Sequence, residues 1–267
     1  MGVINVTPDS FSDGGVHLDS ATAIDAGLRM AEEGADLLDV GGESTRPGAV
    51  PVDADEEIRR VVPVVTALAG EGLTVSVDTS KPQVARAAIE AGAELVNDVT
   101  AAGSDGMAEL VAESGAGLIL MHMKGTPGTM QLDPVYEDVV TEIAGFLEDR
   151  AREVVGRGVD PASIAIDPGI GFGKTASHNL ELIDGLGRLA EHGYPVVLGA
   201  SRKTFLGKIT GIADPVARDG VTAVATALGF ERGARVFRVH DVASSRAALS
   251  LAAAIVSAET WHEWSQD

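Results

Sequence analysis

Polar residues stand at the ends of eight short apolar segments of the sequence. Side chains of these types could bind a flat heterocycle. Asp78, Asn97 and Asp167 supply hydrogen-bond acceptors and one amide that both donates and accepts. Together they can bind a heterocycle that carries ring N–H and exocyclic amino groups. Lys203 could donate a hydrogen bond to a ring carbonyl or nitrogen, or it could form a Schiff base with a carbonyl substrate. Charge alone leaves both uses of Lys203 open.

Arg238 and His240 could bind an anion. They lie two residues apart in a segment predicted as a strand, so both side chains are expected on the same face and can donate to one anion. This pattern favours a phosphate or pyrophosphate near the end of the last strand. A buried ion pair of Arg238 with Asp78 or Asp167 is the alternative.

The glycine-rich segment PGIGFGKT, at 168–175, resembles a phosphate-binding loop but departs from it at its first position. Pro168 stands where the Walker A pattern needs glycine, so we expect a flexible lid whose Phe172 stacks on a ligand. His122 is a poor zinc ligand, because the sequence has no cysteine and no second histidine at helical spacing from it. Met121 is expected in the wall of a pocket or in the core.

Two further loops combine glycine with polar residues, DSFSDGG at 9–15 and GGESTRPGA at 41–49. Each follows a predicted strand, which favours mobile loops that cover a ligand at the strand ends. Ordinary turns have the same composition and are the alternative.

Eight apolar segments are predicted as strands, at 2–6, 35–40, 73–78, 94–99, 117–123, 163–168, 195–201 and 235–242. The stretches between them carry apolar residues at helical spacing, and such alternation implies parallel pairing. Ser80 before Pro82 predicts a helix that Ser80 caps. Four glycines in Glu-x-Gly-Ala repeats are expected to end helices in the left-handed conformation, namely Gly34, Gly92, Gly115 and Gly233.

The number of these units predicts the fold class. Eight strand–helix units are the number that closes a barrel, and no linker divides the chain, so residues 1–267 are predicted as one α/β domain, a single (β/α)8 TIM barrel. The polar strand ends would share one mouth, so the active site is expected at the C-terminal ends of the strands. A doubly wound open sheet is the alternative, because the number of strands does not prove closure.

The composition argues against several classes of function. With 20 Lys and Arg against 40 Asp and Glu, the 267 residues carry a formal net charge of −20, which argues against a nucleic-acid partner. The absence of cysteine excludes disulfides, thiolate metal sites and a cysteine nucleophile. No basic N-terminal region precedes an apolar run, and no stretch reaches the roughly 18 apolar residues of a membrane span. A soluble cytoplasmic protein is therefore expected.

Eight motifs together resemble the dihydropteroate synthase family: NVTPDSFSDGG, GGESTRPGA, SVDT, NDV, MHMKGTPGTMQ, DPGIGFGKT, SRK and RVHDV. They occur in the family's order over nearly the whole chain. The resemblance implies a pterin-binding barrel, usually a homodimer, that condenses 6-hydroxymethyl-7,8-dihydropterin pyrophosphate with 4-aminobenzoate. The products are 7,8-dihydropteroate and pyrophosphate, in folate biosynthesis, with assistance from Mg²⁺. The first strand begins almost at residue 1, whereas relatives have a short lead before it.

The resemblance implies a metal ligand and a set of substrate-binding residues. The Mg²⁺ ligand would be Asn5. Pyrophosphate would be bound by Thr45, Arg238 and His240. The pterin would be bound by Asp78, Asn97, Asp167 and Lys203, and 4-aminobenzoate by Phe11, Pro47 and Thr204. Met121, Phe172 and Val239 complete the substrate-binding set. Asp78, Lys203 and Arg238 are expected to be the catalytic residues.

These assignments suggest a dissociative reaction. If the C–O bond breaks before the amine attacks, a cation develops beside Asp78 while negative charge grows near Arg238, His240 and Mg²⁺. Three alternatives stay open. They are a methyltetrahydrofolate methyltransferase, which has no need for a pyrophosphate site, a Schiff-base aldolase using Lys203, and a non-catalytic paralogue that binds pterin without turnover.

Overall fold

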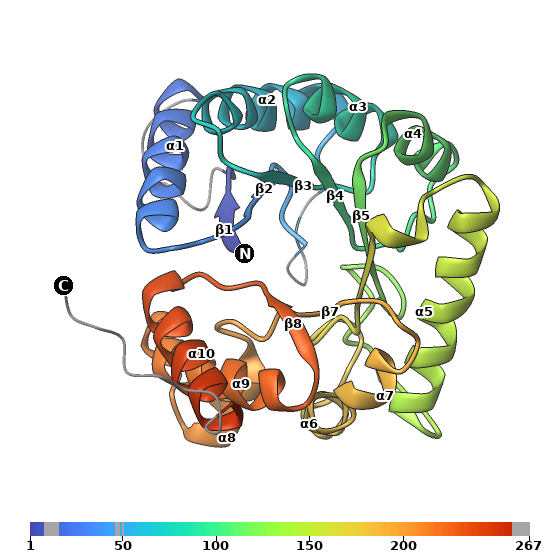
Figure 1. The fold of residues 1–267 in the computed structure, drawn as a ribbon, viewed down its shortest axis with the longest axis vertical. Coiled ribbons are helices and arrows are strands. Elements are labelled where there is room, and N and C mark those ends of the chain that lie inside the picture. Colours follow the sequence, from blue (N-terminus) through green and yellow to red (C-terminus); the bar gives the residue numbers. More distant parts are fainter. Residues whose placement is uncertain (8–15, 46–48, 50, 258–267) are drawn as a thin grey trace.

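The chain folds into parallel strands that alternate with helices (Figure 1). The computed structural model describes residues 1–7, 16–45, 49 and 51–257. The strands are β1 (Gly2–Asn5), β2 (Leu38–Gly41), β3 (Val75–Asp78), β4 (Leu95–Asp98), β5 (Gly117–Met121), β6 (Ile164–Asp167), β7 (Val196–Leu198) and β8 (Ala234–Phe237). Each overlaps one of the eight apolar segments, so the predicted strands are confirmed.

Helices follow the strands and lie outside the sheet (Figure 1). They are α1 (Val16–Glu32), α2 (Ala54–Gly70), α3 (Pro82–Glu90), α4 (Met107–Ser114), α5 (Val139–Gly156), α6 (Ala176–Asp184), α7 (Leu186–Ala190), α8 (Thr204–Thr210), α9 (Asp219–Glu231) and α10 (Val242–Val256). Two 3₁₀ turns, η2 (Pro161–Ser163) and η3 (Val216–Arg218), precede β6 and α9. No helix in the ranges given above is both long and apolar enough to cross a membrane.

One curved sheet holds the strands in the order β1 to β8, each parallel to the next. The two ends of this order also touch. The backbone N–H of Val3 donates to the carbonyl of Val239 at 3.0 Å, and the N–H of Val239 donates to the carbonyl of Met1 at 3.0 Å. The first strand therefore contacts the segment that follows the last one, and the architecture is an α/β fold of the TIM-barrel type.

The register of the sheet aligns the polar strand ends. Partners in neighbouring parallel strands point to the same face, so pairing decides which polar side chains meet. One row of partners runs across β1 to β4 and consists of Asn5, Gly41, Asp78 and Asn97. A separate pair, Met121 and Asp167, joins the ends of β5 and β6.

Helix ends mostly follow the expected chemistry. The four glycines of the Glu-x-Gly-Ala repeats all have positive φ, as predicted for residues that end helices. The prediction for Ser80 is wrong, because α3 begins at Pro82 with Lys81 at the N-cap and no side-chain cap. The carbonyl of Ser80 instead accepts a hydrogen bond from the hydroxyl of Ser104 at 2.7 Å. The loop after β3 thus extends one residue further and packs on the loop after β4.

Candidate active site

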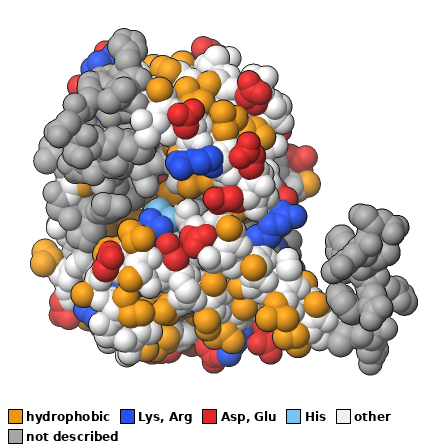
Figure 2. All heavy atoms as spheres, turned by 90° about the vertical axis from the view of Figure 1, so that its left-hand side faces the viewer, with side chains coloured by type: hydrophobic (Ala, Val, Ile, Leu, Met, Phe, Trp, Pro, Cys, Tyr) orange, Lys and Arg blue, Asp and Glu red, His pale blue; other side chains and the backbone are white. Residues whose placement is uncertain are grey.

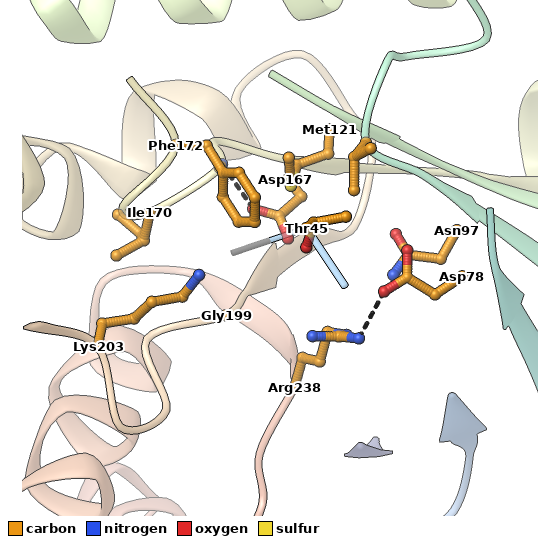
Figure 3. A pocket seen from close by; sticks show the side chains of 12 residues that line it. Thr45, Asp78, Asn97, Met121, Asp167, Ile170, Phe172, Gly199, Lys203 and Arg238 are labelled. Carbon is orange, nitrogen blue, oxygen red and sulfur yellow. Dashed lines mark hydrogen bonds and ion pairs between the residues drawn. The ribbon is translucent and has the colours of Figure 1, made fainter. Parts of the chain in front are cut away.

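A pocket lies where β3 to β8 end (Figure 3). Eight of the predicted residues line it, namely Thr45, Asp78, Asn97, Met121, Asp167, Phe172, Lys203 and Arg238. Four lining residues were not predicted, namely Val99, Gly169, Ile170 and Gly199. The pocket thus joins two carboxylates, an amide and two cations to an apolar wall, which suits a flat polar heterocycle.

Arg238 holds two carboxylates together. Its Nε donates to Oδ2 of Asp39 at 2.6 Å, and its Nη2 donates to Oδ2 of Asp78 at 2.7 Å. The Oδ2 atom of Asp39 also accepts from Nδ2 of Asn97 at 3.1 Å. Arg238 therefore makes the ion pair with Asp78 that the sequence analysis gave as an alternative. The sequence places Asp39 among the polar strand ends but assigns it no role, because its partners depend on the register of β2 against β3 and β4.

Burial disfavours the charged forms of the pocket carboxylates. It raises the pKa of Asp78 to about 7, although the Arg238 guanidinium opposes the shift. It also raises the pKa of Asp167, whose Oδ1 accepts from the backbone N–H of Gly169 at 2.7 Å. Burial opposes the charge of Arg238 too, but the carboxylates of Asp39 and Asp78 raise its pKa above the ordinary value. The guanidinium stays charged and the carboxylates share it.

Lys203 and the glycine-rich loop form the opposite wall. Nζ of Lys203 lies 4.1 Å from the centroid of the Phe172 ring, a cation–π contact (Figure 3). The loop is held in place, because the N–H of Gly171 donates to Oδ1 of Asn179 at 2.7 Å and its carbonyl accepts from Gln131 at 2.8 Å. These hydrogen bonds hold the loop against the pocket, and the flexible lid that the sequence predicts here stays a prediction.

A buried lysine supports this loop from behind. The Lys174 side chain donates to the carbonyl of Phe172 at 2.9 Å, and its Nζ lies 3.0 Å from Nδ1 of His122. Burial lowers the pKa of Lys174 to about 7. Burial, with the nearby Lys174, lowers the pKa of His122 to about 3, so this imidazole is neutral at neutral pH. His122 therefore serves as a hydrogen-bonding partner of Lys174 beneath the pocket.

His240 has a different partner from Arg238. Its Nδ1 lies 2.9 Å from Oγ of Ser201, and its backbone N–H donates to the same oxygen at 3.1 Å. Burial, with the charges of Arg202 and Arg238, lowers the pKa of His240 to about 3. The expectation that both residues lie within the last strand is wrong, because β8 ends at Phe237. The backbone N–H of Arg238 still donates to the carbonyl of Leu198 at the end of β7, at 3.0 Å, and Val239 then pairs with the segment that contains β1.

The other predicted residues lie around the pocket or outside the described chain. Val239 is buried in the core, and Thr204 is exposed at the start of α8. Asn5 is half-buried at the end of β1. Phe11 and Pro47 fall outside the described residues.

The described part of the chain holds no group of three His, Asp or Glu side chains placed to bind a metal. Asn5 offers one hard amide oxygen, on the same row of the sheet as Asp78. A cation that takes most of its oxygen ligands from a substrate and water would fit such a site, and Mg²⁺ is that kind of cation.

Comparisons with known proteins agree with this chemistry. The family model described as pterin binding enzyme matches residues 1–240. The dihydropteroate synthase of Mycobacterium leprae is 48% identical over 261 residues, which cover 95% of this chain and 92% of that protein. A structure of the Xanthomonas albilineans dihydropteroate synthase with 4-aminobenzoic acid is 47% identical, with a TM-score of 0.90 over 96% of this chain and 92% of that one. Another structure of that enzyme, with 7,8-dihydropteroate, is 44% identical, with a TM-score of 0.88 and the same coverage.

Proposed function

The chain belongs to the family of pterin-binding enzymes, and we propose that it catalyses the dihydropteroate synthase reaction. It condenses 6-hydroxymethyl-7,8-dihydropterin pyrophosphate with 4-aminobenzoate and releases 7,8-dihydropteroate and pyrophosphate, in folate biosynthesis. The observation that carries the proposal is that one pocket gathers Asp78, Asn97, Asp167 and Lys203 beside Arg238. Dihydropteroate synthases that are 47–48% identical over nearly the whole chain support the same reaction.

The pterin ring is assigned to the polar floor of the pocket. Asp78 and Asp167 accept hydrogen bonds from ring and exocyclic N–H groups, and Lys203 donates to a ring carbonyl or nitrogen. The ring of Phe172, already against the Lys203 ammonium, covers one face of the heterocycle. Met121 supplies apolar contact on the same wall.

The pyrophosphate is assigned to the cationic side of the pocket, with Thr45, Arg238 and His240. In the described part of the chain, Nε and Nη2 of Arg238 have protein partners and Nη1 has none. That N–H group is available to an anion, which suits a charge-assisted hydrogen bond. Replacement of Arg238 by Ala is expected to weaken pyrophosphate binding, and unchanged affinity would place the anion elsewhere.

The residues favour departure of pyrophosphate before the amine attacks. The C–O bond breaks with its electron pair going to the pyrophosphate, and the nitrogen of 4-aminobenzoate then bonds to the cationic carbon and loses a proton. Asp78 stabilises the cation, and Arg238 stabilises the leaving group. Loss of either contact is expected to lower the rate by about 10²–10³-fold. Mg²⁺, held by Asn5 and substrate oxygens, would shield the pyrophosphate charge.

We also propose that residues 1–267 form one domain, a closed (β/α)8 barrel whose active site lies at the C-terminal ends of the strands. The two hydrogen bonds between Val239 and the segment 1–3 support closure, because an open sheet would leave these edges apart. Protection of the Val239 amide from hydrogen exchange, equal to that of strand amides, is the expected result. Rapid exchange would favour the open sheet.

A homodimer is proposed through α9 and α10. Figure 2 shows hydrophobic side chains gathered on the lower half of the face on which α10 lies in Figure 1. Val224 and Leu228 of α9 and Leu251 and Ile255 of α10 are exposed, and Ile255 retains 66% of its surface. Exposed apolar side chains gathered on one face mark interfaces. Replacement of Leu251 by Asp should convert a dimer into a monomer in light scattering.

A cytoplasmic location without a nucleic-acid or membrane partner completes the proposal. The net charge of −20 repels phosphate backbones and anionic lipid surfaces alike.

The decisive test measures both products from purified protein. Pterin pyrophosphate and Mg²⁺ are supplied with and without 4-aminobenzoate, and pyrophosphate and dihydropteroate are followed together. The proposal expects both products to appear only with 4-aminobenzoate. Pterin binding without product would identify a non-catalytic paralogue, and methyl transfer from methyltetrahydrofolate would identify the methyltransferase. Borohydride trapping of Lys203 with a carbonyl substrate would identify the aldolase.

A further inference from the structure

Asp39 is a fully buried carboxylate beneath the pocket. None of its surface is exposed, and one of its oxygens, Oδ2, accepts from both Nε of Arg238 and Nδ2 of Asn97. Its Oδ1 is also buried and has no hydrogen-bond partner among the described residues. All the hydrogen bonds that the described chain makes to this carboxylate therefore go to two residues that line the pocket.

The register explains how Asp39 reaches both. Asp39 pairs with Ser76, two residues before Asp78, so it lies one layer of side chains deeper than the row that contains Asp78 and Asn97. The residue above it on the same face is Gly41, which has no side chain. A Cβ on Gly41 would lie 3.5 Å from Cβ of Asp78. That is an ordinary van der Waals distance, so the contacts of Asp39 with Arg238 and Asn97 follow from its position one layer deeper.

We propose that Asp39 is a positioning residue that fixes the amide of Asn97 and the guanidinium of Arg238, and thereby sets which groups the pterin pocket presents. The proposal rests on the proposed function, because it concerns how that substrate is selected. Asp39 contacts neither substrate and acts through Asn97 and Arg238.

The amide of Asn97 shows the consequence most clearly. Oδ2 of Asp39 accepts from both Arg238 and Asn97, so the amide turns its NH₂ group toward Asp39. Its Oδ1 is then left to face the pocket as an acceptor (Figure 3). A flipped amide would present a donor at the same point and would oppose a ring N–H or amino group. Asp39 therefore makes the pocket specific for a ligand that donates there.

Arg238 is fixed by the same oxygen. With Nε on Asp39 and Nη2 on Asp78, the guanidinium plane is held at two points, and Nη1 is the remaining nitrogen without a partner in the described chain. Planar guanidinium groups bind carboxylates in such fixed geometries. Loss of Asp39 would leave the Arg238 side chain held by Asp78 alone.

An exchange of the two side chains tests the idea. Asp39→Asn removes the negative charge and can place an NH₂ group against the donors of Arg238 and Asn97. Asn97→Asp places a second carboxylate against that of Asp39. In the protein carrying both changes, the carboxylate at position 97 can accept from the new amide at position 39 and still offer an oxygen to the pocket. Net charge is conserved. Asp36→Asn is the matched control, because Asp36 is exposed just before the other end of β2.

Binding of 7,8-dihydropteroate is measured by calorimetry for the parent and all variants, with thermal unfolding of each. Each single change is expected to weaken binding about tenfold or more, whereas the double variant binds about tenfold more tightly than additive effects predict. The KM for pterin pyrophosphate should rise in Asp39→Asn while the KM for 4-aminobenzoate stays unchanged. Strictly additive losses, or equal increases in both KM values, would overturn the proposal.

A second measurement needs no variant that might fail to fold. In ¹⁵N-labelled parent protein, the assigned side-chain NH₂ of Asn97 should exchange slowly with solvent, because it is held by a buried acceptor. Exchange as fast as that of an exposed amide would overturn the proposal. If the parent protein itself fails to bind 7,8-dihydropteroate while the Asn97 amide is protected, the proposed function fails and the positioning contact stands.

Discussion

Replacement of Asp78 by Asn is expected to stabilise the fold at alkaline pH while it damages the active site. Asp78 is nearly buried, and burial raises its pKa from the ordinary 3.8 to about 7. Asn has almost the same shape, carries no charge to desolvate, and keeps an oxygen that can accept from Arg238. Arg238 does not lose its charged partner, because Asp39 remains bound to its Nε. The cost of breaking a buried ion pair therefore does not arise in full.

The magnitude and its sign follow from proton linkage. Because the folded-state pKa of Asp78 is raised, the folded protein binds this proton more tightly than the unfolded chain, and stability falls as pH rises from about 4 to 7. At about 1.4 kcal/mol per pH unit, the difference between 7 and 3.8 corresponds to about 4 kcal/mol. The Asp78→Asn variant should equal the parent near pH 4 and exceed it by up to about 4 kcal/mol above pH 8.

Urea unfolding followed by circular dichroism between pH 4 and 9 measures this difference. Asp105→Asn, at an exposed position, is the control and should give a difference that stays flat with pH. A stability difference that does not change with pH, or one that favours the parent increasingly as pH rises, would refute the reasoning. The first result would mean that Arg238 fully offsets the cost of burying the ionised carboxylate, and the second that it more than offsets this cost.

Three further predictions concern the same pocket. Gly169→Ala should destabilise the fold by about 2–5 kcal/mol in thermal unfolding, because its φ is +68° and a Cβ would lie 1.9 Å from the carbonyl oxygen of His122; an unchanged melting temperature would contradict this. Lys174→Met should raise the KM for the pterin substrate several-fold, because the carbonyl of Phe172 loses its donor, and steady-state kinetics in which only kcat changes would count against it. The kcat/KM for the pterin substrate should rise with pH through an apparent pKa of about 7, as Asp78 ionises; initial rates that are flat from pH 5.5 to 8 would assign no role to the ionised carboxylate.

The fold was largely predictable because its signals are local. Apolar runs of five to eight residues marked each strand, and glycines such as Gly34 and Gly92 marked helix ends through a conformation that other residues adopt at a cost. The N-cap of α3 was misplaced because Ser80 uses its carbonyl in a contact with Ser104, 24 residues away. Local propensity carries no information about such a partner.

The sequence predicted which residue types form the site better than it predicted which residues contact one another there. The sequence placed polar groups at the strand ends, but the pairing of Arg238 with Asp39 joins residues 199 positions apart. That pairing depends on the register of three strands. The burial of Lys174 was equally hidden, since a lysine in a glycine-rich segment is usually exposed. These contacts are properties of the assembled sheet.

The electrostatics of the pocket link its instability to the proposed reaction. Asp39 and Asp78 share one guanidinium, and Lys203 and Lys174 lie near Asp167, yet burial still raises the pKa of both Asp78 and Asp167. A buried carboxylate whose cationic neighbours do not offset its loss of hydration is costly in the free protein. The same carboxylate attracts positive charge on a bound ligand, and in a dissociative reaction that charge exists only near the transition state. The energy that Asp78 costs the fold is therefore available to lower the barrier, and the substitution that stabilises the protein should be the one that slows it.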